Sequence, residues 1–297
     1  MILVSSKTTI RTIVRLTIAL LGLATVLTIV TTVYAVSAFN QLGNYMISSG
    51  WEKANESILM KQGEELTYEV SYLFIKIGTV RFKFLGEGQY DGKNVYKMAA
   101  YINSYNVPFV NMHAVFESTV DTENFKCYYS RGLQKESYGW SYVIQKFNYR
   151  NGRIIYEQGI NDSMTKQISF PLDKDYTDGV GFIYYMRKLF SISNGERSSY
   201  VVPIMVDTTR SYIKFTLNKK RESCEIDSYN YPIDTYYLDG RIGFQGFFGV
   251  TGYFEGWIAN DPASIPVKGK VKVFLGSVLI QLKGQNRSKW IPPRSVE

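Results

Sequence analysis

The side chains that could do acid–base or metal chemistry are few in this sequence. It contains one histidine, His113, which excludes a multi-histidine metal centre and an H-E-x-x-H zinc site. A Ser-His-Asp triad would have to use His113, and no G-x-S-x-G motif supplies its nucleophile. Walker A and dinucleotide fingerprints are also missing. A structural role for His113 is favoured, and no catalytic residue, metal ligand or cofactor is predicted.

Carboxylates on predicted strands offer a different chemistry. A glycosidase needs two carboxylates that flank a sugar bond, and Trp257 could serve as a sugar platform. No spacing selects a pair, and solvated strand faces explain these side chains as well. A glycan-acting hydrolase therefore stays an alternative, and a non-enzymatic role is preferred. The carboxylates concerned are Glu64, Glu69, Glu117, Asp121 and Glu255.

A cluster of three aspartates, Asp173, Asp175 and Asp178, is similar to a calcium-binding loop. The glycine is displaced by one position, however, and the closing glutamate is missing. A turn followed by a helix cap explains the same residues more simply. No metal site is predicted.

Two features could bind an apolar or amphipathic ligand. In the run from Gly240 to Trp257, glycines alternate with aromatic residues, which fits either the lip of a ligand cavity or a glycine-rich hairpin with a bulged edge. Arg187, on a predicted helix, could meet an anionic head group or form a salt bridge. The candidate ligand-binding residues are Arg187, Phe244, Phe247, Phe248, Tyr253 and Trp257.

Strands dominate the elements that must position these residues. From Glu64 onward apolar and polar residues alternate with a period of two, as in a strand with one buried face. The pairs Asp91-Gly92, Asn151-Gly152 and Asp239-Gly240 predict hairpin turns. Further strands are predicted near 93–104, 114–121, 125–138, 140–150, 153–158, 199–207, 210–219, 233–238, 253–259, 266–275 and 277–283.

One segment has helical periodicity. Asp178 is a plausible N-cap, and the apolar residues that follow predict an amphipathic helix over 179–191, packed on the sheet. The fold class is mainly β: a large curved antiparallel sheet or open barrel over residues 64–284 with one packed helix. Residues 39–63 form a connector, and residues 285–297 a flexible tail. Two smaller sheets, divided near 192–198, are the alternative.

The N-terminus, residues 1–38, carries a targeting signal. Lys7, Arg11 and Arg15 precede the uncharged, apolar run Leu16–Ala38. At about 1.5 Å per residue this run is long enough to cross a bilayer. A cleaved signal peptide and an uncleaved signal anchor both fit, and both place the rest of the chain outside the cytoplasm. A buried core helix is the third reading.

Charge and cysteine content restrict the partners. The formal charge is +8, of which the three N-terminal cations supply three, so the rest carries +5 (8 − 3) spread along its length. The densest basic cluster, Lys219-Lys220-Arg221, is too short for nucleic-acid binding, and none is predicted. Cys127 and Cys224 could form a disulfide in an oxidising compartment.

Three short pieces stand out in order along the chain: Gly63–Val70 with Gly78, Phe170-Pro171-Leu172 leading to Tyr184–Arg187, and Trp257–Asp261 followed by Ile265-Pro266-Val267. Together they resemble the DUF3108 family of exported bacterial proteins of unknown function. The resemblance covers residues 63–284 and implies an exported protein, with no catalytic residues to carry over. The closing strands are also similar to the lipoprotein-carrier fold (LolA/LolB-like), a curved sheet around an apolar cavity.

These observations predict a non-enzymatic cell-envelope protein that binds a lipid or other apolar ligand in the concavity of its sheet. An envelope protein that interacts with or assembles a protein partner is the second hypothesis. The N-terminal segment would contact the membrane, and the remainder would be periplasmic, membrane-anchored or secreted.

Overall fold

The computed structural model describes residues 59–105, 107, 111–193, 197–243, 250–273 and 276–295. These residues form one antiparallel sheet of 14 strands and one long helix, α3 (Gly179–Ile192). The strands are β1 (Glu65–Tyr72), β2 (Ile75–Tyr90), β3 (Lys93–Ser104), β4 (His113–Asp121), β5 (Cys127–Glu136), β6 (Gly139–Asn148), β7 (Arg153–Ile160), β8 (Ser163–Pro171), β9 (Arg197–Val206), β10 (Thr209–Cys224), β11 (Ile233–Ile242), β12 (Val250–Ala259), β13 (Pro266–Val273) and β14 (Ser277–Gln285).

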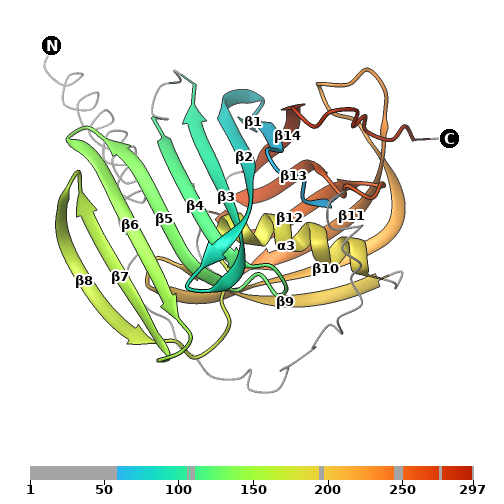
Figure 1. Ribbon diagram of the computed structural model, residues 1–297. Coiled ribbons are helices and arrows are strands. Elements are labelled where there is room, and N and C mark those ends of the chain that lie inside the picture. The colour runs from blue at the N-terminus through green and yellow to red at the C-terminus, as the bar shows by residue number, and fades with distance from the viewer. Residues whose placement is uncertain are drawn as a thin grey trace, which may run out of the picture.

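The strands run as an up-and-down meander broken at one point. Their order is β8-β7-β6-β5-β4-β3-β2-β1-β14-β13-β12-β11-β10-β9, so β1 and β14 pair near the middle and β8 and β9 are the edges. The sheet bends around α3, and the chain crosses from one edge to the other through that helix (Figure 1). The predicted mainly β fold with one large curved sheet and one packed helix is confirmed, and the sheet is open rather than closed.

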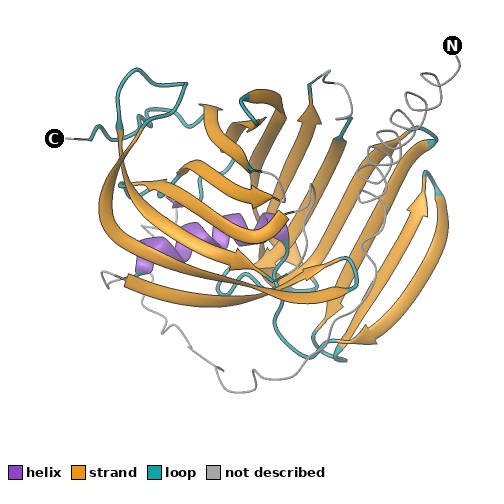
Figure 2. Cartoon of the chain, turned by 180° about the vertical axis from the view of Figure 1, so that it is seen from behind, coloured by secondary structure: helices purple, strands orange, loops and turns teal. Residues whose placement is uncertain are grey.

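The helix forms where its sequence pattern predicts it. The Asp178 carboxylate accepts hydrogen bonds from the backbone N–H groups of Val180 (2.9 Å) and Gly181 (2.8 Å), which satisfies two unpaired donors of the first turn. Nine of its 14 residues are buried, because the sheet lies on more than one side of it (Figure 2). Full burial of one Val, Leu, Phe or Met side chain of this helix contributes about 1.5–3 kcal/mol to the free energy of folding.

Side chains of α3 fill the concave side of the sheet along its length. Val180 and Tyr184 pack into a first cluster with residues of β2 to β7, such as Phe84 and Val120. Phe182, Met186, Leu189 and Phe190 pack into a second cluster with residues of β9 to β12. A third cluster joins β1, β13 and β14 to the segments that follow β10 and β12. The helix thus takes the place where a ligand in the concavity was predicted.

Two details differ from the sequence prediction. Asp239 and Gly240 lie inside β11 and do not form a turn. A Cβ atom on Gly240 would lie 2.5 Å from the backbone oxygen of Lys214 and 2.6 Å from Cζ of Phe254, so glycine is needed there because a neighbouring strand and an aromatic ring both approach closely. Strand β8 was not predicted, because most of its side chains are exposed on both faces and its sequence lacks the apolar alternation.

The C-terminal residues, for which the sequence predicts a flexible tail, are docked on the sheet. The N–H of Asp234 donates to the carbonyl of Pro293 (2.8 Å), and the N–H of Ser295 donates to that of Pro232 (2.9 Å). The indole of Trp290 donates to Asp261 Oδ2 (2.7 Å). These bonds fix the tail although its sequence has no strand or helix pattern.

The two cysteines are free, buried thiols. Cys127 lies in the first core cluster and Cys224 in the third, so the structure does not join them in the disulfide that the sequence allows.

The apolar segment Leu16–Ala38 lies outside the described residues. In the part of the chain that the structure describes, no helix combines the length and apolar character needed to span a bilayer.

Candidate functional site

Arg187, predicted to meet an anionic head group, lies at the centre of the molecule and is fully buried. Its guanidinium donates to Glu64 Oε1 (2.5 Å) and Oε2 (3.2 Å), and to the carbonyls of Leu59 (2.6 Å) and Ala263 (3.0 Å). Arg287 donates to the other side of the same carboxylate at 2.7 Å. Glu64, Arg187 and Arg287, the buried ion triad, therefore tie the start of β1 to α3 and to the C-terminal tail.

The triad keeps Arg187 ionised. Burial acts to lower the pKa of Arg187, and Glu64 more than offsets this, so the pKa stays above its ordinary value. Protein groups thus occupy the donors that a head group would need. The Nε atom of Arg187 and the hydroxyl of Tyr184 have no partner, but both are buried beneath protein.

The other strand carboxylates are paired as well. Glu69 lies between Lys76 and Lys283, with Lys283 Nζ 2.9 Å from Oε1. Glu117 faces Arg131 at 3.6 Å, and Glu255 accepts from the hydroxyl of Tyr237 at 3.0 Å. Each of these three carboxylates therefore has a local partner within the protein.

The predicted aromatic lip divides between two faces of β12. Phe254 and Ile258 pack with α3 in the second cluster. Tyr253 and Trp257 alternate with them along the strand and therefore face away from the helix. The Trp257 indole donates to Glu222 Oε2 at 3.0 Å. Phe244, Phe247 and Phe248 lie outside the described residues.

The three clustered aspartates have separate roles. Asp173 accepts from the hydroxyl of Tyr176 (2.9 Å), Asp175 lies 4.0 Å from Lys126, and Asp178 caps α3. Among the described residues, no group of three or more His, Cys, Asp or Glu side chains could hold a metal ion.

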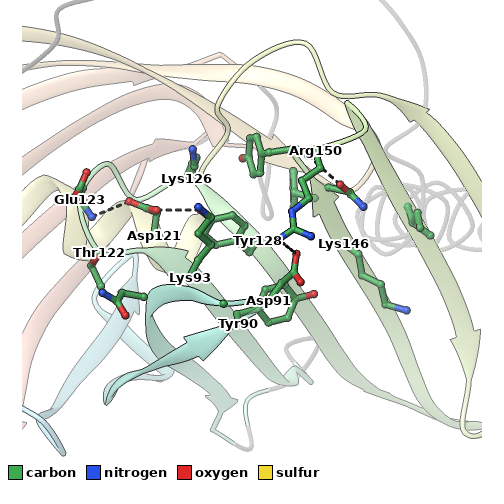
Figure 3. A pocket seen from close by; sticks show the side chains of 16 residues that line it. Tyr90, Asp91, Lys93, Asp121, Thr122, Glu123, Lys126, Tyr128, Lys146 and Arg150 are labelled. Atoms are coloured by element: carbon green, nitrogen blue, oxygen red, sulfur yellow. Dashed lines mark hydrogen bonds and ion pairs between the residues drawn. The ribbon is translucent and has the colours of Figure 1, made fainter.

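An open pocket of about 1020 Å³ lies at one end of the sheet, across three neighbouring hairpin turns (Figure 3). The turns join β2 to β3, β4 to β5, and β6 to β7. We call it the turn pocket. It is lined by Tyr90, Asp91, Gly92, Lys93, Asn94, Asp121, Thr122, Glu123, Lys126, Tyr128, Lys146, Phe147, Asn148, Tyr149, Arg150 and Ile155.

Local sequence builds each of the three turns. Asp91 and Gly92 both have positive φ (47° and 72°), as tight hairpin turns with the pair Asp-Gly require. Asp121 Oδ1 accepts from the N–H groups of Glu123 (2.9 Å) and Asn124 (3.2 Å). Asn148 Oδ1 accepts in the same manner from the N–H groups of Arg150 and Asn151. Short polar side chains thus form hydrogen bonds within these loops.

The middle turn is also fixed to the helix. Phe125 is fully buried with a left-handed φ of 59°, and its ring stacks on Tyr185 of α3 with centroids 5.2 Å apart. Lys188 of α3 donates from Nζ to the carbonyls of Thr122 (3.1 Å) and Glu123 (2.9 Å). The core therefore positions the floor of the turn pocket.

Tyrosines form one wall of the pocket. Tyr90 stacks on Tyr128, and Tyr128 meets Tyr149 edge to face, with centroids 6.1 Å and 5.5 Å apart. Burial and the nearby Asp121 carboxylate raise the pKa of Tyr128, and burial raises that of Tyr149, so both hydroxyls stay protonated. The Tyr128 hydroxyl donates to Asp121 Oδ2 at 3.0 Å.

Four cations surround these rings. Lys126 Nζ lies 4.8 Å from the centroid of Tyr149, and Arg150 faces Asp91 at 3.6 Å across the rim (Figure 3). Lys146 pairs with Glu157 at 2.8 Å, and Lys93 is exposed. Against them stand Asp91, Asp121 and Glu123 in the lining and Glu157 beside Lys146, so four cations meet four carboxylates. The pocket therefore offers both cations and hydrogen-bond acceptors to a polar ligand.

The turn pocket was missed by the sequence prediction, although its signal was present. In an up-and-down meander every second turn falls at the same end of the sheet. The turns at Asp91-Gly92 and Asn151-Gly152 were predicted. Three turns lie between them along the chain, two at the opposite end of the sheet and one at the same end. Residues next to such alternate turns could therefore have been grouped before the fold was known.

Comparisons with known proteins identify a family of unknown function. The model of the family described as "Protein of unknown function (DUF3108)" matches residues 67–283. No curated protein matches the chain.

Two solved structures are similar at 9% identity. A beta-barrel-like protein of the domain of unknown function DUF1849 from Brucella abortus has a TM-score of 0.45, over 75% of this chain and 96% of its own. A protein with a YmcC-like fold from Bacteroides fragilis has a TM-score of 0.29, over 76% of this chain and 97% of its own.

Proposed function

The chain belongs to the DUF3108 family, and we propose that it is a non-enzymatic binding protein of the cell envelope whose ligand occupies the turn pocket. The envelope location rests on the basic residues and apolar run at the N-terminus, which are typical of a signal peptide or signal anchor. The observation that carries the binding role is the combination of stacked tyrosines with four cations in one open pocket.

The ligand is a small molecule with hydroxyl groups and an anionic group, of the size of a phosphorylated sugar or a lipid head group. Tyrosine rings and hydroxyls offer flat surfaces and hydrogen bonds, and lysine and arginine side chains attract the anion. This shifts the predicted lipid ligand from the concavity to the pocket, because α3 fills the concavity under the sheet.

Contacts of the carboxylates support a non-enzymatic role. In the turn pocket the Asp121 carboxylate accepts from its own loop and from Tyr128. Asp91 is paired with Arg150. A glycosidase needs two carboxylates that face the same sugar bond, and both of these carboxylates are held by partners of the protein's own.

Binding is tested by calorimetric titration of the full-length protein in detergent with glycerol 3-phosphate, with glycerol and inorganic phosphate as separate arms. Glycerol 3-phosphate should bind more tightly than either part alone. Substitution Lys126→Gln should weaken binding about tenfold, which is the loss of one charge-assisted hydrogen bond of about 1.4 kcal/mol.

Lys135→Gln is the matched control, because Lys135 is an exposed lysine near the opposite end of β5. It should bind like the unsubstituted protein. Equal loss in both variants, or binding of inorganic phosphate alone with the same affinity, would count against the turn pocket as the site of a hydroxyl-bearing anion.

Protein interaction is a second candidate function, favoured by the edge strand β8. In the strand order of the described residues β8 has a partner on one side only, and most of its residues are exposed. Such an edge can add a strand from another chain. Photo-crosslinking from Gln167 in native membranes should capture one defined protein if β8 serves this role, and a diffuse pattern would oppose it.

A further inference from the structure

The hairpin turn between β1 and β2 exposes three consecutive apolar residues. Leu73 is 56% exposed, Phe74 102% and Ile75 57%. Among the residues that the structure describes, none thus covers the ring of Phe74. Exposed single apolar residues are common, but an uncovered Phe between two half-exposed aliphatic residues at a protruding tip is not.

The backbone of this turn is also unusual for its side chains. Tyr72 pairs with Ile75, so Leu73 and Phe74 are the two central residues, and both have left-handed φ angles (46° and 69°). Asn-Gly or Asp-Gly is preferred in such turns, because bulky side chains are strained there. The chain uses Asp91-Gly92 for the same task in the next hairpin. Leu-Phe at the first turn is therefore unfavourable for folding and points to a use of the exposed side chains.

The base of the hairpin carries cations and tyrosine hydroxyls. Lys76, next to the tip, pairs with Glu69 and lies 3.8 Å from Asp227. The Tyr105 hydroxyl donates to Glu69 Oε1 at 3.0 Å, and Lys283 Nζ lies 2.9 Å from that hydroxyl. Below the apolar tip, one tyrosine and two lysines thus share the carboxylate of Glu69, and tyrosine and lysine are common where segments rest at a membrane interface.

We propose that the Leu73-Phe74-Ile75 tip inserts into the interfacial region of a bilayer that contains anionic phospholipids. A fluid acyl layer accepts a protruding ring without a complementary pocket, whereas a protein partner would need one. The charge of +5 (8 − 3) on the chain beyond the N-terminal segment favours an anionic surface, and the predicted N-terminal membrane segment keeps such a surface within reach. This inference is independent of the turn pocket.

The test places an environment-sensitive dye (NBD) on Cys at position 74 of the full-length chain, as Phe74→Cys, in vesicles of phosphatidylglycerol and phosphatidylcholine. Cys127 and Cys224 are 0% and 3% exposed, so the dye labels the new thiol. Met164→Cys, at a 53% exposed apolar position on β8, is the matched control. Emission from position 74 should shift to the blue and be quenched by doxyl-labelled acyl chains, whereas position 164 should behave as in water.

A second variant separates insertion from folding. In the double substitution Leu73→Asn and Phe74→Gly the turn receives its preferred residues, so the fold is retained. A dye on Ile75→Cys should be quenched in the original background and lose at least half of that quenching in the Asn-Gly background. Water-like emission at position 74 in vesicles, or equal quenching of Ile75→Cys in both backgrounds, would overturn the proposal. Equal quenching in pure phosphatidylcholine would overturn the preference for anionic lipid.

Discussion

The buried ion triad and the turn pocket use the same kinds of side chain in opposite surroundings. In the triad, Arg187 and Glu64 are fully buried, and Arg287 holds the other carboxylate oxygen. In the turn pocket, Arg150 and Asp91 are 75% and 67% exposed and 3.6 Å apart. Buried charges need full pairing, because leaving one unpaired costs several kcal/mol, whereas exposed charges are solvated and free to exchange partners.

This difference separates a structural arginine from arginine and lysine side chains that a ligand can reach. Arg187 was predicted to meet an anionic head group from its place on the helix, yet its two terminal nitrogens donate to groups of the fold. The turn pocket keeps its cations near the surface and beside aromatic rings. The following predictions test that contrast, from the largest expected effect to the smallest.

Substitution Glu64→Gln should lower the free energy of unfolding by about 3–5 kcal/mol, because it leaves Arg187 and Arg287 buried without their counter-charge. Chemical denaturation of the two proteins measures this. Glu117→Gln, at an exposed pair with Arg131, is the control and should change stability by less than about 1 kcal/mol. Similar losses in both variants would show that burial is not what makes the triad structural.

Substitution Asp178→Ala should cost about 1–2 kcal/mol, because it removes the N-cap of α3 and leaves the Ser118 hydroxyl without its acceptor. Asp178→Asn keeps an oxygen that can accept from the same N–H groups and should lose less. Thermal and chemical denaturation compare the three proteins. An equal loss in both variants would mean that the carboxylate charge matters more than the cap.

The exposure of Glu69 and its lysine partners lies between that of the buried ion triad and that of the turn pocket. The Glu69 carboxylate should make a pH-dependent contribution to stability. Its pKa is lowered to about 2 from 4.5, mainly by the hydrogen bond from Lys76 and then by Lys283 and Tyr105. A lowered pKa in the folded state means that the stabilisation is present above pH 4.5 and is lost as the pH falls toward 2. The effect should stay below about 1 kcal/mol, because the lysines are half exposed.

Melting temperatures of the parent and Glu69→Gln proteins, measured at about pH 6 and about pH 3, check this sign. The parent should lose more stability on acidification than the variant. A larger loss in the variant would contradict the assignment of Glu69 as a carboxylate stabilised in its charged form.

Substitution Arg150→Ala in the turn pocket should change the free energy of unfolding by less than about 0.5 kcal/mol, because its pair with Asp91 is exposed. The same variant should weaken binding of glycerol 3-phosphate in the titration described above. A loss of stability like that of Glu64→Gln would place Arg150 among the structural charges.

Much of the fold was predicted from the sequence, because its signals are local. Alternating apolar residues marked the strands, and Asp178 with the apolar spacing that follows it marked α3 within one residue of its observed end. Strand β8 was missed, because an edge strand exposed on both faces has no alternation to detect. Asp239-Gly240 was misread as a turn, because the two contacts that explain that glycine, the carbonyl of Lys214 and the ring of Phe254, come from the neighbouring strands.

The sequence by itself determined a mainly β chain with one helix, the absence of multi-histidine chemistry and the turns that border the pocket. Only the tertiary structure decided which charges are buried and which are available. Glu64, Arg187 and Arg287 are separated by up to 223 residues, and no local pattern states that they meet. Their pairing, the filling of the concavity by α3 and the convergence of three turns in one pocket all depend on how the sheet curves. That curvature arises from side-chain packing between distant strands and the helix, which periodicity does not encode.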